Sequence, residues 1–509
     1  MIALDGNTLT IDDVILVARE FLPVELSPAG SQQILKSRAW VEKTLQEEKP
    51  VYGISTGFGE FSKIFITREK REKLQHNLIL SHAACVGEYL PEDVVRAAML
   101  LRANSLAKGY SGIRLSTVEI LLEMLNRRVY PAVPSKGSVG ASGDLAPLSH
   151  VALVMLGEGQ AFINGQLVSG REALAAAGLD PVSLGGKEGL ALINGTQIMT
   201  AVGVLLWHDA ASLMKVADIA AAMSLEALRG TRTAFDERIG RVRPHPGQLA
   251  TADNVVKLTE GSTIIASHVD CSKVQDAYSL RCVPQVHGAS KDAVRRIYEA
   301  LVVEINAATD NPLIMPDTGE VISGGNFHGQ PIALAMDYLK MALAEIGSIA
   351  ERRINRMLDA HLSELPPFLT AYPGIDSGLM ITQYTAAALV SENKVLAHPA
   401  CVDSIPTSAN QEDHVSMGTI AARQAREILE NVRYVLAIEL LAAVQGIDFL
   451  SSLKPGAGTA AAYNCIRRRV PHLEEDRVPA PDINAIYQII TDGTLVLDTE
   501  NITGQLLHI

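Results

Sequence analysis

The sequence is poor in aromatic side chains and in cysteine. Only 5% of its 509 residues are Phe, Tyr or Trp, too few for the stacking surfaces on which single-stranded nucleic acids bind. Acidic residues outnumber basic ones by 57 to 44, a net charge of −13, so the basic surface that nucleic acids require is lacking as well. The cysteines are scattered and never stand at CxxC spacing, which argues against a disulfide framework or a thiolate metal site: Cys85, Cys271, Cys282, Cys401 and Cys465.

The sequence also lacks a secretory signal and a convincing membrane span. The first six residues carry Asp5 and no basic residue, unlike the start of a signal peptide. One stretch, residues 189–208, contains no Asp, Glu, Lys or Arg, but it includes the polar run 194–197, and charge returns at Asp209 and Lys215. A buried helix after a polar loop explains this pattern better than a membrane helix does. We therefore expect a soluble, cytoplasmic protein.

Long helices dominate the predicted structure. Apolar residues make up 48% of the chain and charged residues 20%, which is typical of a globular protein. Helical spacing of apolar residues extends over three long stretches, 198–228, 328–358 and 415–450. Stripes of this length favour a bundle of extended helices that cross at small angles. In the second stretch the stripe consists of Ile332, Met336, Leu339, Leu343, Ile346 and Ala350.

Shorter elements are predicted in the first part of the chain. Asn164-Gly165 stands between two apolar runs and predicts a β-hairpin, because both residues tolerate positive φ. Ser169 and Glu172 then have the spacing of a helix capping box. The predicted fold is mainly α, a long-helix bundle with a smaller mixed α/β N-terminal region. We expect an N-terminal domain at 1–193, the bundle core at 194–450 and a C-terminal cap of short elements at 451–509.

The most unusual segment is the glycine-rich stretch 137–147, Gly-Ser-Val-Gly-Ala-Ser-Gly-Asp-Leu-Ala-Pro. A phosphate-binding P-loop requires Lys-Ser/Thr after its last glycine, whereas Asp144 follows here and would repel phosphate. A nucleophile elbow requires G-x-S-x-G, and residues 140–143 are one residue short. A simple glycine turn is a third possibility.

A fourth interpretation is chemical. The Gly143 nitrogen can attack the Ala141 carbonyl carbon and close a five-membered ring, and loss of water together with the Ser142 hydroxyl leaves an electrophilic alkene, a methylidene-imidazolone. The residue types suit this chemistry, because Gly143 lacks a Cβ, Ala141 is small and Ser142 supplies the leaving hydroxyl. Asp144 is expected to cap a following helix with Pro147 in its first turn. Such a helix would place the electrophile at its positive end.

This segment and six others resemble the aromatic amino acid ammonia-lyases, whose order of motifs they share. The chain length, without long insertions, resembles the bacterial members that act on histidine. The matching stretches are Val51-Tyr-Gly-Ile-Ser-Thr-Gly-Phe-Gly59, Ser81-His-Ala-Ala84, Ala141-Ser-Gly143, Ala191-Leu-Ile-Asn-Gly-Thr196, Gln275-Asp-Ala-Tyr-Ser-Leu-Arg281, Gly324-Gly-Asn-Phe-His-Gly329 and Thr407-Ser-Ala-Asn-Gln-Glu-Asp-His414.

The resemblance implies an enzyme, a carbon–nitrogen lyase that removes ammonia from L-histidine and gives trans-urocanate, the first step of histidine degradation. It implies a methylidene-imidazolone formed autocatalytically from Ala141, Ser142 and Gly143, with no external organic cofactor. It further implies a homotetramer in which one active site draws residues from three chains. The histidines do not cluster at metal-ligand spacing, and we assign no metal.

The resemblance also implies roles for individual residues. Tyr52, in a glycine-flanked loop, matches the family's mobile lid tyrosine, which is proposed as the base. Arg281 matches the residue that holds the substrate carboxylate, which a guanidinium can bind with two hydrogen bonds, and Tyr278 is expected on the same helical face. The remaining matches are expected to line the pocket around the prosthetic group and substrate: Asn194, Gln275 and Phe327.

Two residues bear on substrate choice. His82 and Glu412 match the members that act on histidine, whereas those that act on phenylalanine and tyrosine usually carry glutamine at the position of Glu412. A buried carboxylate beside a phenyl ring would be unpaired, whereas an imidazole N–H offers it a charge-assisted hydrogen bond. Glu412 is an alternative base to Tyr52. Two other interpretations stay open: a tyrosine or phenylalanine ammonia-lyase or aminomutase with the same electrophile, and a helical assembly protein without activity.

Overall fold

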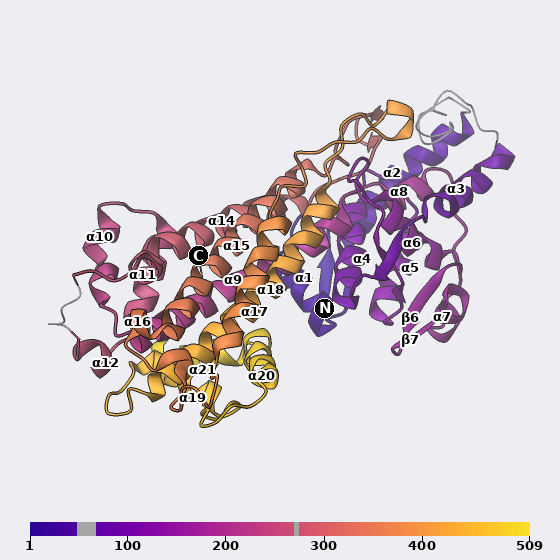
Figure 1. Cartoon of the computed structure of the whole chain (residues 1–509). Helices are drawn as coiled ribbons and strands as arrows, with labels where there is room; N and C mark the ends of the chain where they lie inside the picture. Colours follow the sequence, from indigo (N-terminus) through magenta and orange to yellow (C-terminus); the bar gives the residue numbers. More distant parts are fainter. Residues whose placement is uncertain (48–67, 269–273, 509) are drawn as a thin grey trace. The chain divides into compact units, whose positions relative to one another are not determined.

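The computed structural model describes residues 1–47, 68–268 and 274–508. The chain divides into two compact units, each described here by itself. The first unit comprises Met1–Leu205, Glu299–Asp337 and Pro399–Arg423, and the second comprises Leu206–Tyr298, Tyr338–His398 and Gln424–Ile509. Helices dominate both units (Figure 1), which confirms the predicted fold class.

The first unit combines helices with small sheets. Its sheets are the pairs β1–β2, β3–β5 and β8–β9 and the three-stranded β4–β6–β7. The elements are β1 (Ile2–Leu4), α1 (Ile11–Glu20), β2 (Val24–Leu26), α2 (Pro28–Gln46), α3 (Arg68–His82), β3 (Val86–Tyr89), α4 (Glu92–Ala107), α5 (Leu115–Asn126), β4 (Tyr130–Pro131), β5 (Pro134–Lys136), α6 (Leu145–Met155), β6 (Gln160–Ile163), β7 (Gln166–Ser169), α7 (Gly170–Ala176), α8 (Glu188–Ile193), β8 (Leu313–Met315), β9 (Glu320–Ile322) and the short η4 (Ser408–Asn410).

The predicted hairpin and capping box are both present. β6 and β7 pair antiparallel, and the turn residues Asn164 and Gly165 have φ values of +51° and +76°. The Ser169 side chain accepts a hydrogen bond from the Glu172 amide, and the Glu172 carboxylate accepts one from the Ser169 amide. The turn residues and the capping box therefore form the hairpin and the start of α7 that the sequence predicted.

Four long helices contribute residues to both units. They are α9 (Gln197–Ala227), α14 (Val283–Glu304), α15 (Gln330–Leu358) and α18 (Gly418–Asp448). The predicted helices at 198–228, 328–358 and 415–450 correspond to α9, α15 and α18 and are confirmed to within a few residues. No helix in the described part of the chain is both long enough and apolar enough to span a bilayer, which agrees with the expectation for 189–208.

In the second unit, segments of the four long helices lie side by side (Figure 1), and buried polar contacts join them. Ser224 on α9 donates to Glu439 on α18 at 2.6 Å, and Arg353 on α15 binds the same carboxylate. The remaining elements are η2 (Arg232–Phe235), α10 (Glu237–Arg241), α11 (Pro246–Leu258), α12 (Thr263–Ala266), α13 (Tyr278–Arg281), α16 (Ala360–Ser363), η3 (Pro367–Leu369), α17 (Met380–Leu396), α19 (Ala457–Arg467), α20 (Ala480–Thr491) and α21 (Thr494–Thr503).

Candidate active site

The Ala141-Ser142-Gly143 tripeptide lies in the first unit, just before α6. Ala141 is 8% exposed and packs against Val415 and Met417. Gly143 has a φ of +71°, and a Cβ added to it would lie 2.1 Å from the Gly195 carbonyl oxygen. Only glycine fits this close approach, and the expected ring chemistry also places a residue without a Cβ here.

The segment Asn194-Gly195, which follows α8, holds the tripeptide from one side. The Asn194 Nδ2 donates to the Ser142 carbonyl oxygen at 2.9 Å. The Asp144 amide donates to the Gly195 carbonyl oxygen at 2.6 Å. Because these bonds fall on both sides of Gly143, they restrict the backbone around its nitrogen. Asn194 thus lies beside the tripeptide, while its expected role in lining the pocket stays a prediction.

Asp144 stands at the N-cap position of α6, but its side chain makes no capping bond to that helix. Its carboxylate instead accepts from the Met199 amide in the first turn of α9 at 2.9 Å and from the hydroxyls of Thr419 at 2.6 Å and Ser138 at 2.8 Å. The predicted N-cap position of Asp144 is therefore confirmed, but its carboxylate binds partners from distant segments and makes no capping hydrogen bond to α6. Burial raises the pKa of Asp144, and the Thr419 hydroxyl and Met199 amide oppose that rise.

Glu412 faces the tripeptide directly. The Ser142 hydroxyl donates to Glu412 Oε1 at 2.8 Å, and the Thr407 hydroxyl donates to Oε2 at 2.7 Å. Between Thr407 and Glu412, residues 408–410 all have positive φ values between 50° and 68°. This conformation costs conformational free energy for a residue other than glycine, and residues that adopt it are concentrated at functional sites. The loop thus places a carboxylate against the hydroxyl that the proposed ring chemistry removes.

His82 ends α3 in the same unit and is half-buried. Burial lowers the pKa of His82, and the negative charge of Glu412 acts in the opposite direction, so the imidazole lies within electrostatic range of the carboxylate. A neutral imidazole at neutral pH can donate or accept a hydrogen bond. The structure therefore brings His82, Ser142, Asn194 and Glu412 into one region of the first unit. Phe327, half-buried between β9 and α15, belongs to this unit as well.

The other predicted residues are not in this cluster. Gln275, Tyr278 and Arg281 belong to the second unit, which is described separately. There the Tyr278 side chain is 70% exposed, and the Arg281 guanidinium carbon lies 4.5 Å from the centre of its ring. This contact supports the expectation that Tyr278 and Arg281 share a face. Tyr52 lies outside the described residues.

Sequence reasoning missed several residues that hold the site together. Thr407 is the first residue of the block 407–414, which also contains Glu412. Its place in that block could have indicated a role in the site. Ser138 and Thr419, which bind Asp144, had no such signal, because small hydroxyl residues are common in loops and helix starts. Arg102 was detectable as the charged residue in the otherwise apolar run 97–103 of α4, because a charge is rarely buried without a partner.

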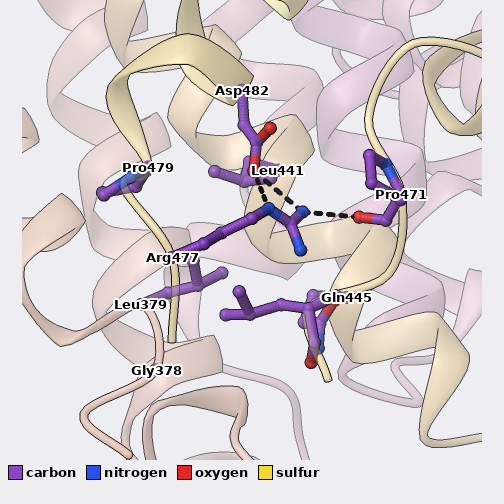
Figure 2. Close-up of a pocket in the computed structure, with 9 residues that line it drawn as sticks. Gly378, Leu379, Leu441, Gln445, Pro471, Arg477, Pro479 and Asp482 are labelled. Carbon is purple, nitrogen blue, oxygen red and sulfur yellow. Dashed lines mark hydrogen bonds and ion pairs between the residues drawn. The ribbon is translucent and has the colours of Figure 1, made fainter. Parts of the chain in front are cut away.

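A hollow in the second unit offers no competing site. Its centre is filled by Arg477 (Figure 2), which binds Asp482 through Nε at 2.9 Å and Nη2 at 2.8 Å. Its nitrogens also donate to the carbonyl oxygens of His472 at 2.9 Å and Pro471 at 2.7 Å. A guanidinium with this set of partners fixes the 471–482 segment. We assign no ligand to it.

Comparison with known proteins gives the family. The family model described as aromatic amino acid lyase matches residues 9–468. The chain belongs to the aromatic amino acid lyase family. A histidine ammonia-lyase of Caldanaerobacter subterraneus subsp. tengcongensis is 58% identical over 503 residues, 98% of this chain and 99% of that protein. The family resemblance that the seven sequence blocks indicated is thereby confirmed.

Solved structures of family members agree in fold. The crystal structure of histidine ammonia-lyase from Trypanosoma cruzi has a TM-score of 0.93 and 43% identity, and the match covers 100% of this chain and 96% of that chain. A tyrosine aminomutase from Streptomyces globisporus has a TM-score of 0.94 and 40% identity, covering 99% of both chains. The lyase family therefore includes close structural neighbours with different reactions, and the choice between them depends on the residues of the site.

Proposed function

We propose that this family member is a histidine ammonia-lyase that converts L-histidine into trans-urocanate and ammonia. One observation carries the proposal: the Ser142 hydroxyl lies 2.8 Å from the Glu412 carboxylate in a tripeptide that is packed tightly enough to require Gly143. The curated relative at 58% identity, named histidine ammonia-lyase, supports the choice of substrate.

The tripeptide fits a methylidene-imidazolone, and its formation balances without an added reagent. A bond forms between the Gly143 nitrogen and the Ala141 carbonyl carbon. The Ala141 oxygen leaves as water with the amide protons of Gly143 and Ser142. The Ser142 hydroxyl and its Cα proton leave as a second water, and a Cα–Cβ double bond remains. Both steps are dehydrations, so no oxidant or reductant is required.

When formed, the prosthetic group supplies an electrophile that turns the substrate amine into a leaving group. The surrounding residues then have separate tasks. Asn194 donates to the Ser142 carbonyl oxygen and keeps the ring in place. Glu412 presents a carboxylate to the imidazole of the substrate, and His82 provides a second polar contact. Removal of the β-proton is assigned to Tyr52 or to Glu412, and pH–rate profiles of Tyr52→Phe and Glu412→Gln distinguish the two.

The second unit supplies the binding site for the carboxylate of the substrate. Arg281 has the guanidinium geometry for bidentate binding, and Tyr278 stacks beside it. Gln275, exposed on the same segment, adds an amide, and Phe327 of the first unit contributes an apolar wall. We propose that these residues complete the site in a cytoplasmic homotetramer, in which one site takes residues from three chains.

A tyrosine aminomutase or ammonia-lyase is the second candidate, because a tyrosine aminomutase is among the similar structures. Purified protein is assayed with L-histidine, L-tyrosine and L-phenylalanine, and urocanate, coumarate, cinnamate and β-amino acids are measured. We expect urocanate as the main product. A clear preference for tyrosine would overturn the assignment to histidine.

The prosthetic group is tested by intact mass. The mature chain should weigh two water molecules less than its sequence, and Ser142→Ala should retain the fold and lose turnover by about 10³-fold or more, since the electrophile provides several kcal/mol of the barrier reduction. Active enzyme of full unmodified mass, or turnover retained in Ser142→Ala, contradicts the proposal. Loss of both activity and the mass deficit in the folded variant also excludes an assembly protein without catalytic function.

A further inference from the structure

Arg102 is a fully buried cation in the middle of α4. Its side chain is 1% exposed, although a guanidinium loses hydration energy when it is buried. Burial lowers the pKa of Arg102 to about 10, and the negative charge of Asp310 opposes the change. The side chain is therefore still cationic at neutral pH, so its position requires partners that stabilise the charge.

The partners of Arg102 lie at the junction of α8 and α9. Its Nη1 donates to the Asn194 carbonyl oxygen at 2.7 Å and to the Gln197 Oε1 at 3.0 Å. Asn194 is the C-cap residue of α8, and carbonyl groups at helix ends lack partners within the helix, so a cation there is favourable. Within the described residues Nε and Nη2 have no hydrogen-bond acceptor. The contacts of the guanidinium thus depend on one nitrogen.

The Asn194 carbonyl belongs to the peptide group that joins Asn194 to Gly195. Two hydrogen bonds join this segment to the residues on either side of Gly143. The Asn194 side chain donates to the Ser142 carbonyl oxygen, and the Gly195 carbonyl oxygen accepts from the Asp144 amide. There is little free space, because a Cβ on Gly195 would lie 2.6 Å from Arg102 Nη1. Holding the Asn194 carbonyl therefore also holds the two contacts that shape the backbone around the Gly143 nitrogen.

We propose that Arg102 is a positioning residue for the ring closure of Ala141-Ser142-Gly143. By binding the Asn194 carbonyl, it fixes the 194–195 segment against Ser142 and Asp144, so that the Gly143 nitrogen is kept near the Ala141 carbonyl carbon. Arg102 touches none of the reacting atoms. The inference rests on the proposed function, because it presupposes that the tripeptide cyclises, and it adds a residue of α4 to that maturation.

The test compares Arg102→Met, Arg102→Gln and Arg102→Lys in the full-length chain. The Met and Gln side chains end about two bonds short of the Nη1 position and cannot reach Asn194. Lysine can bring one cationic N–H to the same carbonyl and so replace the first of the two hydrogen bonds that Nη1 makes. Protein is purified at intervals after induction, the folded fraction is isolated by size exclusion, and its intact mass is measured.

We expect loss of the two water molecules to be slowed roughly tenfold or more in the Met and Gln variants, as the loss of a charge-assisted hydrogen bond implies. Arg102→Lys is expected to mature within about threefold of the parent chain. Should Arg102→Met not fold, Arg102→Gln, which keeps a polar end in the pocket, provides the comparison.

Arg96 gives a matched control on the same helix. It is 2% exposed and binds the Val17 carbonyl and the Tyr130 hydroxyl, away from the 194–195 segment. Arg96→Gln should lower the melting temperature and still lose both waters at the parent rate. The inference is overturned if folded Arg102→Gln matures at the parent rate, or if Arg96→Gln slows maturation equally. A parent chain of full mass would instead refute the proposed function, so the two failures are distinguishable.

Discussion

At the scale of single residues, the hydrogen bonds of Glu412 would connect the proposed maturation to the proposed catalysis. Its two carboxylate oxygens accept from the hydroxyls of Ser142 and Thr407. In the proposed maturation, the Ser142 hydroxyl is the group that leaves. From then on, of these two donors only the Thr407 hydroxyl remains, and Oε1 is released for the imidazole of the substrate. We therefore expect Thr407 to orient the carboxylate in the proposed mature site.

This dependence predicts the effect of Thr407→Val, which removes the hydroxyl and keeps the shape of the side chain. A hydrogen bond to a charged group contributes about 1.5 kcal/mol or more, so kcat/KM for L-histidine should fall roughly tenfold. The intact mass should still lack two water molecules, because Asn194 and Asp144 keep their contacts. Steady-state kinetics and mass spectrometry on the same preparation check both statements.

A second threonine–glutamate pair serves as the control. Thr318 donates to Glu320 at 2.8 Å on an exposed turn, and its replacement by valine should leave kcat/KM unchanged. An unchanged kcat/KM in Thr407→Val would contradict the orienting role of Thr407. A lost mass deficit would show that Thr407 acts in maturation instead.

At the scale of elements, the sequence predicts what is local or periodic. The apolar stripes of α9, α15 and α18 repeat over several helical turns, and Asn164-Gly165 and Ser169–Glu172 each act within a few residues. The contacts of Asp144 were not predictable, because Thr419 is 275 residues away in the sequence. A single sequence does not indicate which distant hydroxyl will lie beside the carboxylate. The same reason applies to the contact between Arg102 and Asn194.

The helices of the second unit also enclose a polar network that periodicity does not reveal. His287 on α14 has its Nδ1 2.9 Å from Asp218 on α9, and its Nε2 faces Arg353 at 3.5 Å. Lys291 binds Asp218 as well, and Arg353 binds Glu439. A neutral imidazole that donates from Nδ1 and accepts at Nε2 matches both neighbours. Burial lowers the pKa of His287 from its ordinary 6.5, and Arg353 adds to that effect.

The network predicts how stability depends on pH. Because the folded pKa of His287 lies below its unfolded value, the unfolded chain binds more protons as the pH falls below 6.5, and the free energy of unfolding decreases. Urea unfolding at about pH 7.5 and pH 5.5, at one protein concentration, should show this loss. His287→Gln, which can keep both hydrogen bonds without titrating, should show a smaller loss. Equal losses in both proteins would exclude His287 as a source of the dependence.

At the scale of the whole molecule, the residues expected in one active site come from two units. Ser142 contacts both Asn194 and Glu412 in the first unit, whereas Gln275, Tyr278 and Arg281 belong to the second. The three consecutive domain ranges expected from the sequence remain a prediction, while α9, α14, α15 and α18 contribute to both units. The lyase family resemblance implies that one site combines several chains, which is consistent with separate contributions from the two units.

A site shared between chains predicts complementation. Ser142→Ala and Arg281→Met should each be inactive, but co-expression should restore activity, because mixed tetramers contain sites with an intact tripeptide from one chain and an intact arginine from another. With random assembly, roughly a quarter of the sites would have both. Ser142→Ala mixed with Glu412→Ala is the control: these residues touch within one chain, so no mixture can assemble both intact parts. Urocanate formation by the purified mixed tetramers measures the difference, and absence of recovery in the first pair would show that each site is built within one chain.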